Sequence, residues 1–170
     1  MLKISKELVM HRLEQAKNEL ADAKLLYNNK SYLSANNRAY YSIFHTIRAV
    51  LALEPIDFKK HKDVLAHFNK NYINTEIFPK AMGKRITQAN RIREDSDYDD
   101  EYVAKPEATE AQIATAEELI KLVSEYIKSK MWKISKISKN KEKLFMRRRF
   151  TNSKFSMKFI LSNFNVIKKI

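Results

Sequence analysis

Residues 31–53 read SYLSANNRAYYSIFHTIRAVLAL, and this stretch decides the fold because its apolar side chains follow a helical period. At 100° per residue, the large apolar side chains fall on one side of a helix, at Leu33, Tyr40, Phe44, Ile47 and Leu51. A side that is apolar over such a width is typical of a helix packed into a core. We expect the helix to end before Glu54 and Pro55.

Apolar residues recur at helical spacing in four further segments, at residues 5–29, 60–72, 79–93 and from 106 to about 127. In the first segment, the apolar side chains are Leu8, Leu13, Ala16, Leu20, Ala23 and Tyr27. In the second, we expect Val64, Leu65 and Phe68 to point inward. In the last, the apolar positions are Ile113, Ala116, Leu119, Ile120, Val123 and Ile127.

Several polar residues and prolines mark the ends of these helices. Ser31 is a candidate N-cap, and Pro79 and Pro106 each stand where a first helical residue is expected. Thr109 and Gln112 have the spacing of a capping box. We expect an acidic loop from residue 94 to residue 101, between the last two helices.

The composition narrows the fold class. Among 170 residues there are one glycine, three prolines and no cysteine. This excludes glycine-rich nucleotide-binding loops and most tight hairpin turns. It also excludes disulfides, thiol nucleophiles and cysteine-ligated zinc. The sequence therefore predicts an all-α fold, an up-and-down bundle of four to five helices.

Positive charge is concentrated at the end of the chain. The whole chain has 33 Lys+Arg and 20 Asp+Glu, a net charge of +13. Residues 131–170 contain 12 Lys+Arg and one acid, Glu142, whereas residues 1–130 are almost neutral. We therefore predict a helical bundle over residues 5–129 and a basic tail over 131–170.

The tail has two interpretations. Its basic run, Arg147 to Arg149, would suit a phosphate backbone or an anionic membrane surface. However, its Lys, Asn, Ile and Phe are also the residues that A/T-rich codons encode. We favour a disordered or non-native extension over a dedicated binding tail.

No apolar run approaches the ~20 residues of a spanning helix, and the charged N-terminus is unlike a secretory signal. We therefore expect a soluble, cytoplasmic protein without a membrane span.

Arg38 and His45 are candidate functional residues on the other side of the central helix. They are seven residues apart, so two turns place them near one line, ~10 Å apart along the axis. A guanidinium matches the oxygens of a phosphate, and an imidazole exchanges a proton near neutral pH. Together they suit attack of a ribose 2′-hydroxyl on the adjacent phosphate without a metal. The alternative is a solvated helix face with one hydrogen-bonded histidine.

Small residues surround this pair. Ser42, Ala49 and Ala52 lie beside Arg38 and His45, and small side chains let another backbone approach closely. We expect a second copy of the chain to pack there, so that a twofold dimer places both pairs in one shared cleft.

The stretch NRAYYSIFH, residues 37–45, resembles the second-helix motif of the HEPN domain family, in which four to six residues separate an Arg from a following His. Residues 91–98, RIREDSDY, resemble a later segment of the same family, and the resemblance covers residues 5–129. It implies a helical bundle, homodimerisation through the motif helix and cleavage of RNA without metal or other cofactor. It also implies a toxin with a minimal nucleotidyltransferase as antitoxin partner.

By this resemblance, Arg38 would bind and polarise the scissile phosphate, and His45 would be the acid–base group. Tyr41 points near Arg38 and could stack on a base; with Asn37 and Arg93 it is an expected substrate contact. Two positions depart from the family pattern. Active members usually carry a polar residue at the position of Ala39. Some toxins carry a tyrosine two residues after the His, which their antitoxin modifies, and this chain has Ile47 at that position.

Metal sites are not expected. Asp95, Asp97 and Asp99 alternate like the start of a calcium loop, but Asp100 stands where glycine is needed and Pro106 where glutamate is needed. His61 and His67 are six residues apart and do not share a helix face.

Three functions stay open: a HEPN ribonuclease or toxin, a non-catalytic HEPN module that binds a nucleotide or a nucleotidyltransferase partner, and a bundle without a role in nucleic-acid chemistry.

Overall fold

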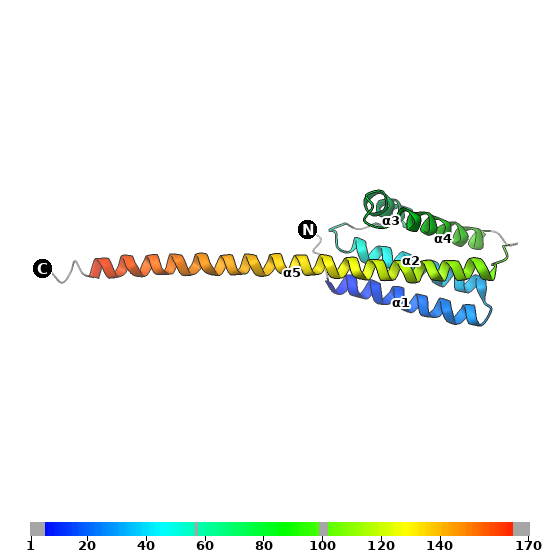
Figure 1. Cartoon of the computed structure of the whole chain (residues 1–170), viewed down its shortest axis with the longest axis horizontal. Helices are drawn as coiled ribbons and strands as arrows, with labels where there is room; N and C mark the ends of the chain where they lie inside the picture. Colours follow the sequence, from blue (N-terminus) through cyan, green and yellow to red (C-terminus); the bar gives the residue numbers. More distant parts are fainter. Residues whose placement is uncertain (1–5, 57, 99–101, 165–170) are drawn as a thin grey trace. The chain divides into compact units, whose positions relative to one another are not determined.

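The computed structural model describes residues 6–56, 58–98 and 102–164 (Figure 1). Over these ranges the chain is all-α, as predicted, and contains no strand. Its elements are α1 (Lys6–Asn28), α2 (Tyr32–Leu51), α3 (His61–Phe68), the π-helix η1 (Asn69–Ile73), α4 (Lys80–Tyr98) and α5 (Pro106–Phe164). None of the helices in the described ranges combines the length and the apolar character that crossing a bilayer requires.

The bundle forms the first of two units, Met1–Ile127, and the second unit is Lys128–Ile170. Helix α5 continues to Phe164, although its apolar spacing beyond Ile127 is too irregular to predict a helix. In the second unit, the side chains of Trp132 and Ile137 are exposed. That residues 131–170 are a disordered or non-native extension stays a prediction.

Helix α2 is the centre of the bundle and is buried around most of its circumference. Tyr40, Phe44, Ile47 and Leu51 lie in the core, as predicted. The expectation was wrong for Leu33, which is 43% exposed, because it lies in the first turn of α2, before the first buried position of that helix at Ala35.

Two of the three small residues predicted to face a second chain, Ser42 and Ala49, pack inside the monomer instead, whereas Ala52, just after the end of α2, is partly exposed. Ser42 and Ala49 are completely buried. The Oγ of Ser42 donates a hydrogen bond to the backbone oxygen of Ala16 in α1, at 2.7 Å. The small side chains therefore serve the close approach of α1 to α2.

Helices α1 and α5 both pack against α2. Helix α1 buries Val9, Leu13, Ala16 and Ala23, whereas Leu8 is exposed, contrary to the prediction. The first part of α5 buries its predicted apolar side chains, and the Nε2 of Gln112 donates to the backbone oxygen of Asn36 at 2.8 Å. The predicted capping box is therefore wrong: Thr109 lies inside the helix, where its Oγ1 donates to the oxygen of Lys105.

Helix α4 continues to Tyr98, so the predicted acidic loop begins too early. Contacts between residues four apart support the extra turn: Asn90 Nδ2 donates to Glu94 at 3.0 Å, and Arg91 pairs with Asp95 at 3.7 Å. Residues 99–101 of that loop lie outside the described residues. At the start of α2, Ser31 occupies the N-cap position as predicted, but its side chain makes no capping hydrogen bond.

Gly83, the chain's one glycine, generates a prediction about packing. A Cβ at this position in α4 would lie 2.7 Å from the Cγ2 of Ile73, a buried side chain in η1. We expect Gly83→Ala to lower the free energy of unfolding by about 1 kcal/mol, because overpacking outweighs the gain in helix propensity. Urea unfolding measures this change. The control Ala114→Gly, at an exposed interior site of α5, should lose about 1 kcal/mol through propensity alone; a more stable Gly83→Ala variant would contradict the expectation.

Candidate active site on helix α2

One narrow side of α2 stays open to solvent. Beyond Leu33, the residues of this helix that are at least partly exposed recur every three or four positions, with one adjacent pair. We call them the α2 strip: Ser34, Asn37, Arg38, Tyr41, His45 and Arg48. Four of the five side chains predicted to act on RNA belong to the strip: Asn37, Arg38, Tyr41 and His45. The strip contains no carboxylate of its own.

Arg38 is held between a carboxylate and an aromatic ring. Its Nη1 lies 3.0 and 3.3 Å from the two carboxylate oxygens of Glu19 in α1. Its guanidinium carbon lies 5.6 Å from the ring centre of Tyr41, which confirms that Tyr41 points near Arg38. The Arg38 side chain is 41% exposed and that of Glu19 21% exposed, so solvent still reaches the pair.

Sequence reasoning missed Glu19. A signal was present, because α1 and α2 are joined by a short turn. Residues at similar distances from such a turn come to lie side by side, and Glu19 and Arg38 meet this condition within about one helical turn.

His45 is partly buried beside several cationic groups. Its Nδ1 is buried and has no hydrogen-bond partner in the described part of the chain. Burial lowers the pKa of His45 below its ordinary value of 6.5, and the nearby Arg48, Arg12, His61 and His11 lower the pKa further. The imidazole is therefore mostly neutral at pH 7, so it is able to accept a proton.

The ring of Phe44 joins three of these groups. His61, the first residue of α3, stacks on it with ring centres 4.0 Å apart, and the guanidinium carbon of Arg48 lies 5.9 Å from its centre. The ring of His45 lies 6.2 Å away. Sequence reasoning gave His61 no role, since no spacing along one helix relates it to His45.

Asn37 and Arg93 connect the strip to α4. The Oδ1 of Asn37 accepts a hydrogen bond from the Oγ of Ser96 at 3.5 Å. The guanidinium carbon of Arg93 lies 5.9 Å from the ring centre of Tyr40. Arg93 therefore lies next to a core residue of α2 rather than on the strip. Ser96 was missed because its segment was expected to be a loop.

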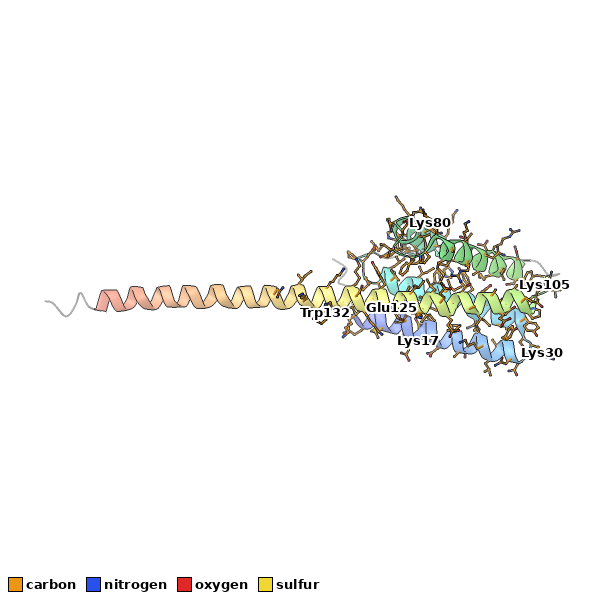
Figure 2. The ribbon with its side chains drawn as sticks, in the orientation of Figure 1. Lys17, Lys30, Lys80, Lys105, Glu125 and Trp132 are labelled. Atoms are coloured by element: carbon orange, nitrogen blue, oxygen red, sulfur yellow. The ribbon has the colours of Figure 1, made fainter. Side chains whose placement is uncertain are left out.

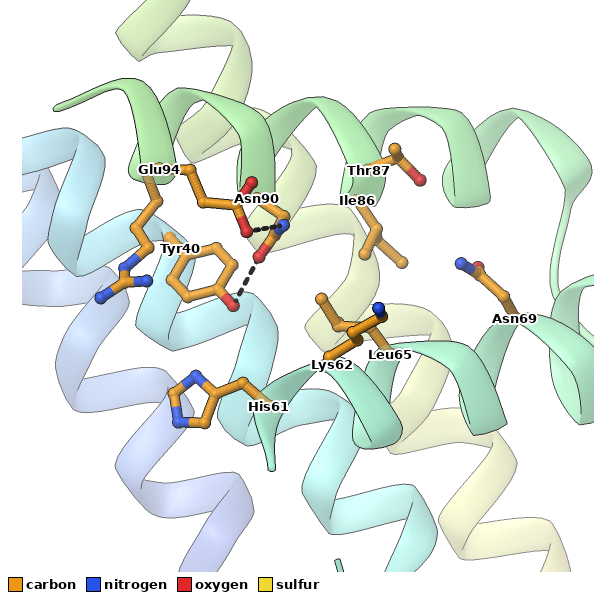
Figure 3. A pocket seen from close by; sticks show the side chains of 10 residues that line it. Tyr40, His61, Lys62, Leu65, Asn69, Ile86, Thr87, Asn90 and Glu94 are labelled. Atoms are coloured by element: carbon orange, nitrogen blue, oxygen red, sulfur yellow. Dashed lines mark hydrogen bonds between the residues drawn. The ribbon is translucent and has the colours of Figure 1, made fainter. Parts of the chain in front are cut away.

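A pocket of about 440 Å³ lies between α3 and α4, and the side chains drawn in Figure 3 line it. Tyr40 donates a hydrogen bond through its Oη to the Oδ1 of Asn90 at 3.0 Å, and Asn90 donates in turn to Glu94. Burial raises the pKa of Tyr40 to about 12, so its hydroxyl stays protonated and donates at neutral pH. His61 belongs both to this pocket and to the group around Phe44.

No three His, Cys, Asp or Glu side chains of the described residues gather closely enough to hold a metal ion. The groups that meet at the strip are cationic and aromatic, with Glu19 as the carboxylate at Arg38. Such an arrangement is suited to binding a phosphate and to moving a proton at His45.

The sequence matches the HEPN domain family over residues 9–126, which span the bundle from α1 to the first third of α5. The chain belongs to the HEPN family. It is 32% identical over 123 residues to a putative toxin of Methanocaldococcus jannaschii, with 72% of this chain and 91% of the relative covered. A second putative toxin of that organism is 31% identical over 118 residues, with 69% and 80% covered. A UPF0332 protein of Thermotoga maritima is 35% identical over 92 residues, with 54% and 70% covered.

Both departures from the HEPN motif fall on residues that point away from the strip. Ala39 is completely buried in a cluster with Ala23 and Ile113. Ile47 is also completely buried. In this HEPN chain, neither position is therefore able to contribute a side chain to the open side of α2.

The cations around His45 lead to a prediction about its pKa. We expect Arg48→Gln to raise the pKa of His45 toward 6.5, because the variant removes a positive charge that disfavours the imidazolium. An NMR titration of the histidine ring protons measures this value. Lys17→Gln, which removes a charge from the exposed side of α1 (Figure 2), should leave it unchanged. A pKa of His45 that is unchanged or lower in Arg48→Gln would show that Arg48 has no such effect.

Proposed function

We propose that this HEPN protein is the toxin of a toxin–antitoxin pair and cleaves RNA as a homodimer without a metal ion. The observation that carries the proposal is the joint presence, on the open strip of α2, of the Arg38 guanidinium and an imidazole, His45, whose pKa is lowered. The names of the two relatives from Methanocaldococcus jannaschii support the assignment as a toxin.

The proposed reaction uses Arg38 to bind and His45 to move a proton. Neutral His45 accepts the proton of a ribose 2′-hydroxyl while the 2′-oxygen forms a bond to the adjacent phosphorus. Arg38 binds the non-bridging oxygens and stabilises their charge in the transition state. The bond from phosphorus to the 5′-oxygen breaks, and the imidazolium returns its proton to that oxygen. The products are a 2′,3′-cyclic phosphate and a 5′-hydroxyl.

The homodimer would form along the α2 strip. A twofold axis beside the strip would bring two copies of Arg38 and His45 into one cleft. Leu33, exposed in the first turn of α2, supplies apolar surface next to the strip for such a contact. Asn37, Tyr41 and Arg93 would contact the RNA around the scissile phosphate, with Tyr41 available to stack on a base.

The antitoxin would be a minimal nucleotidyltransferase that neutralises the toxin by binding. At the position where some HEPN toxins carry the tyrosine modified by their antitoxin, this chain has the buried and chemically inert Ile47. We therefore expect neutralisation by covering the strip, in the cytoplasm, rather than by modification of residue 47.

A second function is favoured by the ion pair between Arg38 and Glu19. A guanidinium that keeps its carboxylate partner would have a structural role, which would suit a non-catalytic HEPN module that binds a nucleotide or a nucleotidyltransferase. The two functions differ in whether Glu19 gives way to a phosphate.

Cleavage of RNA in EDTA tests the ribonuclease directly. We expect the purified chain to cut single-stranded RNA, and His45→Ala or Arg38→Gln to lower the rate by about 100-fold or more, because each removes a group of the reaction. Gel analysis of labelled RNA measures the rate. Lys17→Gln should cleave like the parent. A parent that never cuts RNA would rule out the ribonuclease and leave the non-catalytic module.

Mixing the two inactive variants tests the shared cleft. A mixed dimer keeps one intact Arg38 and one intact His45, so co-refolded His45→Ala and Arg38→Gln chains should regain part of the activity. Recovery of none, from a sample that sedimentation shows to be dimeric, would place each complete site within one subunit.

Removing the carboxylate of Glu19, which competes with the RNA phosphate for Arg38, should strengthen the binding of RNA. We expect Glu19→Gln to raise the rate of cleavage at limiting RNA by up to about 5-fold at low salt, since a partly exposed ion pair contributes at most about 1 kcal/mol. Initial rates at 20 and 200 mM salt measure the effect. Glu117→Gln, which breaks the exposed pair of Lys24 and Glu117, is the matched control. A rate that falls in Glu19→Gln would indicate that Glu19 positions Arg38 for the reaction instead.

A further inference from the structure

The pocket between α3 and α4 has no role in the reaction as described above, yet its lining is chemically specific. The side chains that converge on it in Figure 3 include two amides, Asn69 and Asn90, a carboxylate, Glu94, and a cation, Lys62. Leu65 and Ile86 give it apolar surface. A volume of about 440 Å³ is large enough for one planar heterocycle with its sugar. This combination of apolar surface and polar groups suits a nucleobase better than a hydrocarbon.

Hydrogen bonds within the lining orient the groups that would contact the base. Tyr40 donates to the Oδ1 of Asn90, and the Nδ2 of Asn90 donates to the Oε1 of Glu94. Asn90 keeps one amide proton and Glu94 keeps acceptor sites on both oxygens. A carboxylate only accepts hydrogen bonds, so Glu94 requires N–H donors on the edge of the ligand.

The pocket and the α2 strip are linked by contacts through His61 and Phe44. The ring of His61 lines the pocket and stacks on Phe44, the residue that precedes His45. Arg93, over the ring of Tyr40, lines the same pocket. An RNA strand that passes His45 would therefore meet an aromatic ring and a cation before a base enters the pocket, and these are the groups that bind unpaired nucleotides.

We propose that this pocket binds one unpaired base of the RNA substrate, with Glu94 accepting hydrogen bonds from its Watson–Crick edge and His61 stacking at the entrance. The inference rests on the proposed function and adds sequence preference to it. Guanine fits best, because its N1 and N2 present two neighbouring N–H donors to one carboxylate. Glu94 and His61 thereby become residues that determine specificity, outside the Arg38 and His45 pair.

Binding to the full chain carrying His45→Ala tests the pocket without cleavage. The probes are labelled uridine oligomers with one guanine, moved through the sequence, and oligomers with an abasic site at the same position. At one position we expect the guanine oligomer to bind about tenfold more tightly than the abasic one, measured by fluorescence anisotropy. Glu94→Gln should abolish this preference, since an amide replaces the carboxylate at nearly the same size. The control Glu118→Gln, whose carboxylate pairs with Arg85 outside the pocket, should retain it.

The outcomes separate this inference from the proposed function. Two results would overturn the base pocket: equal affinity for guanine and abasic oligomers at every position, or a preference for guanine that survives Glu94→Gln in a variant with unchanged thermal unfolding. In either case, cleavage of RNA by the parent in EDTA would still support the ribonuclease. Titrating guanosine alone into the protein tests the pocket without RNA. NMR shifts at His61 that Glu94→Gln removes would support the pocket even if the parent cuts no RNA.

Discussion

The close contact between α1 and α2 is the constraint on which the rest of the structure depends. It requires small side chains, and the hydrogen bond from Ser42 to the backbone of Ala16 shows how near the two helices come. Because this side of α2 packs against α1, and Tyr40, Phe44 and Ile47 lie in the core, the orientation of α2 about its own axis is fixed. Arg38 and His45 then lie on the one side that the described parts of the chain leave open.

The electrostatics of the strip follow from that rotation. Arg48, Arg12, His61 and His11 reach His45 from three helices and lower its pKa. Arg48 and Arg12 carry a permanent positive charge that also attracts a phosphate, so binding and protonation are coupled. A bound phosphate would offset the cations and raise the pKa of His45 toward its ordinary value. In the proposed reaction, His45 would therefore accept a proton most readily once the substrate is in place.

Helical periodicity and the near absence of glycine predicted the fold class. Periodicity also predicted most of the core face of α2, because burial of a helix leaves a regular pattern in the sequence. It did not assign the small residues correctly, since Ser42 and Ala49 would look the same against α1 or against a second chain. The contacts of Arg38 with Glu19 and of Phe44 with His61 join separate helices, and only the packing of the bundle brings them together. The last turn of α4 was missed although Asn90 and Glu94, four residues apart, already indicated it.

Glu19 has a further consequence for how Arg38 would work. A long arginine side chain loses conformational freedom when it binds a phosphate, and this cost falls if the guanidinium is already held in place. Glu19 and Tyr41 hold it in the free chain, but Glu19 must also give way to the phosphate, and we expect this competition to be the larger of its two effects. Because the pair with Glu19 is partly solvated, exchanging it for a phosphate requires little free energy, and a phosphate offers the guanidinium two oxygens in matching geometry. The same ion pair that would suit a structural arginine is thus compatible with one prepared to bind RNA.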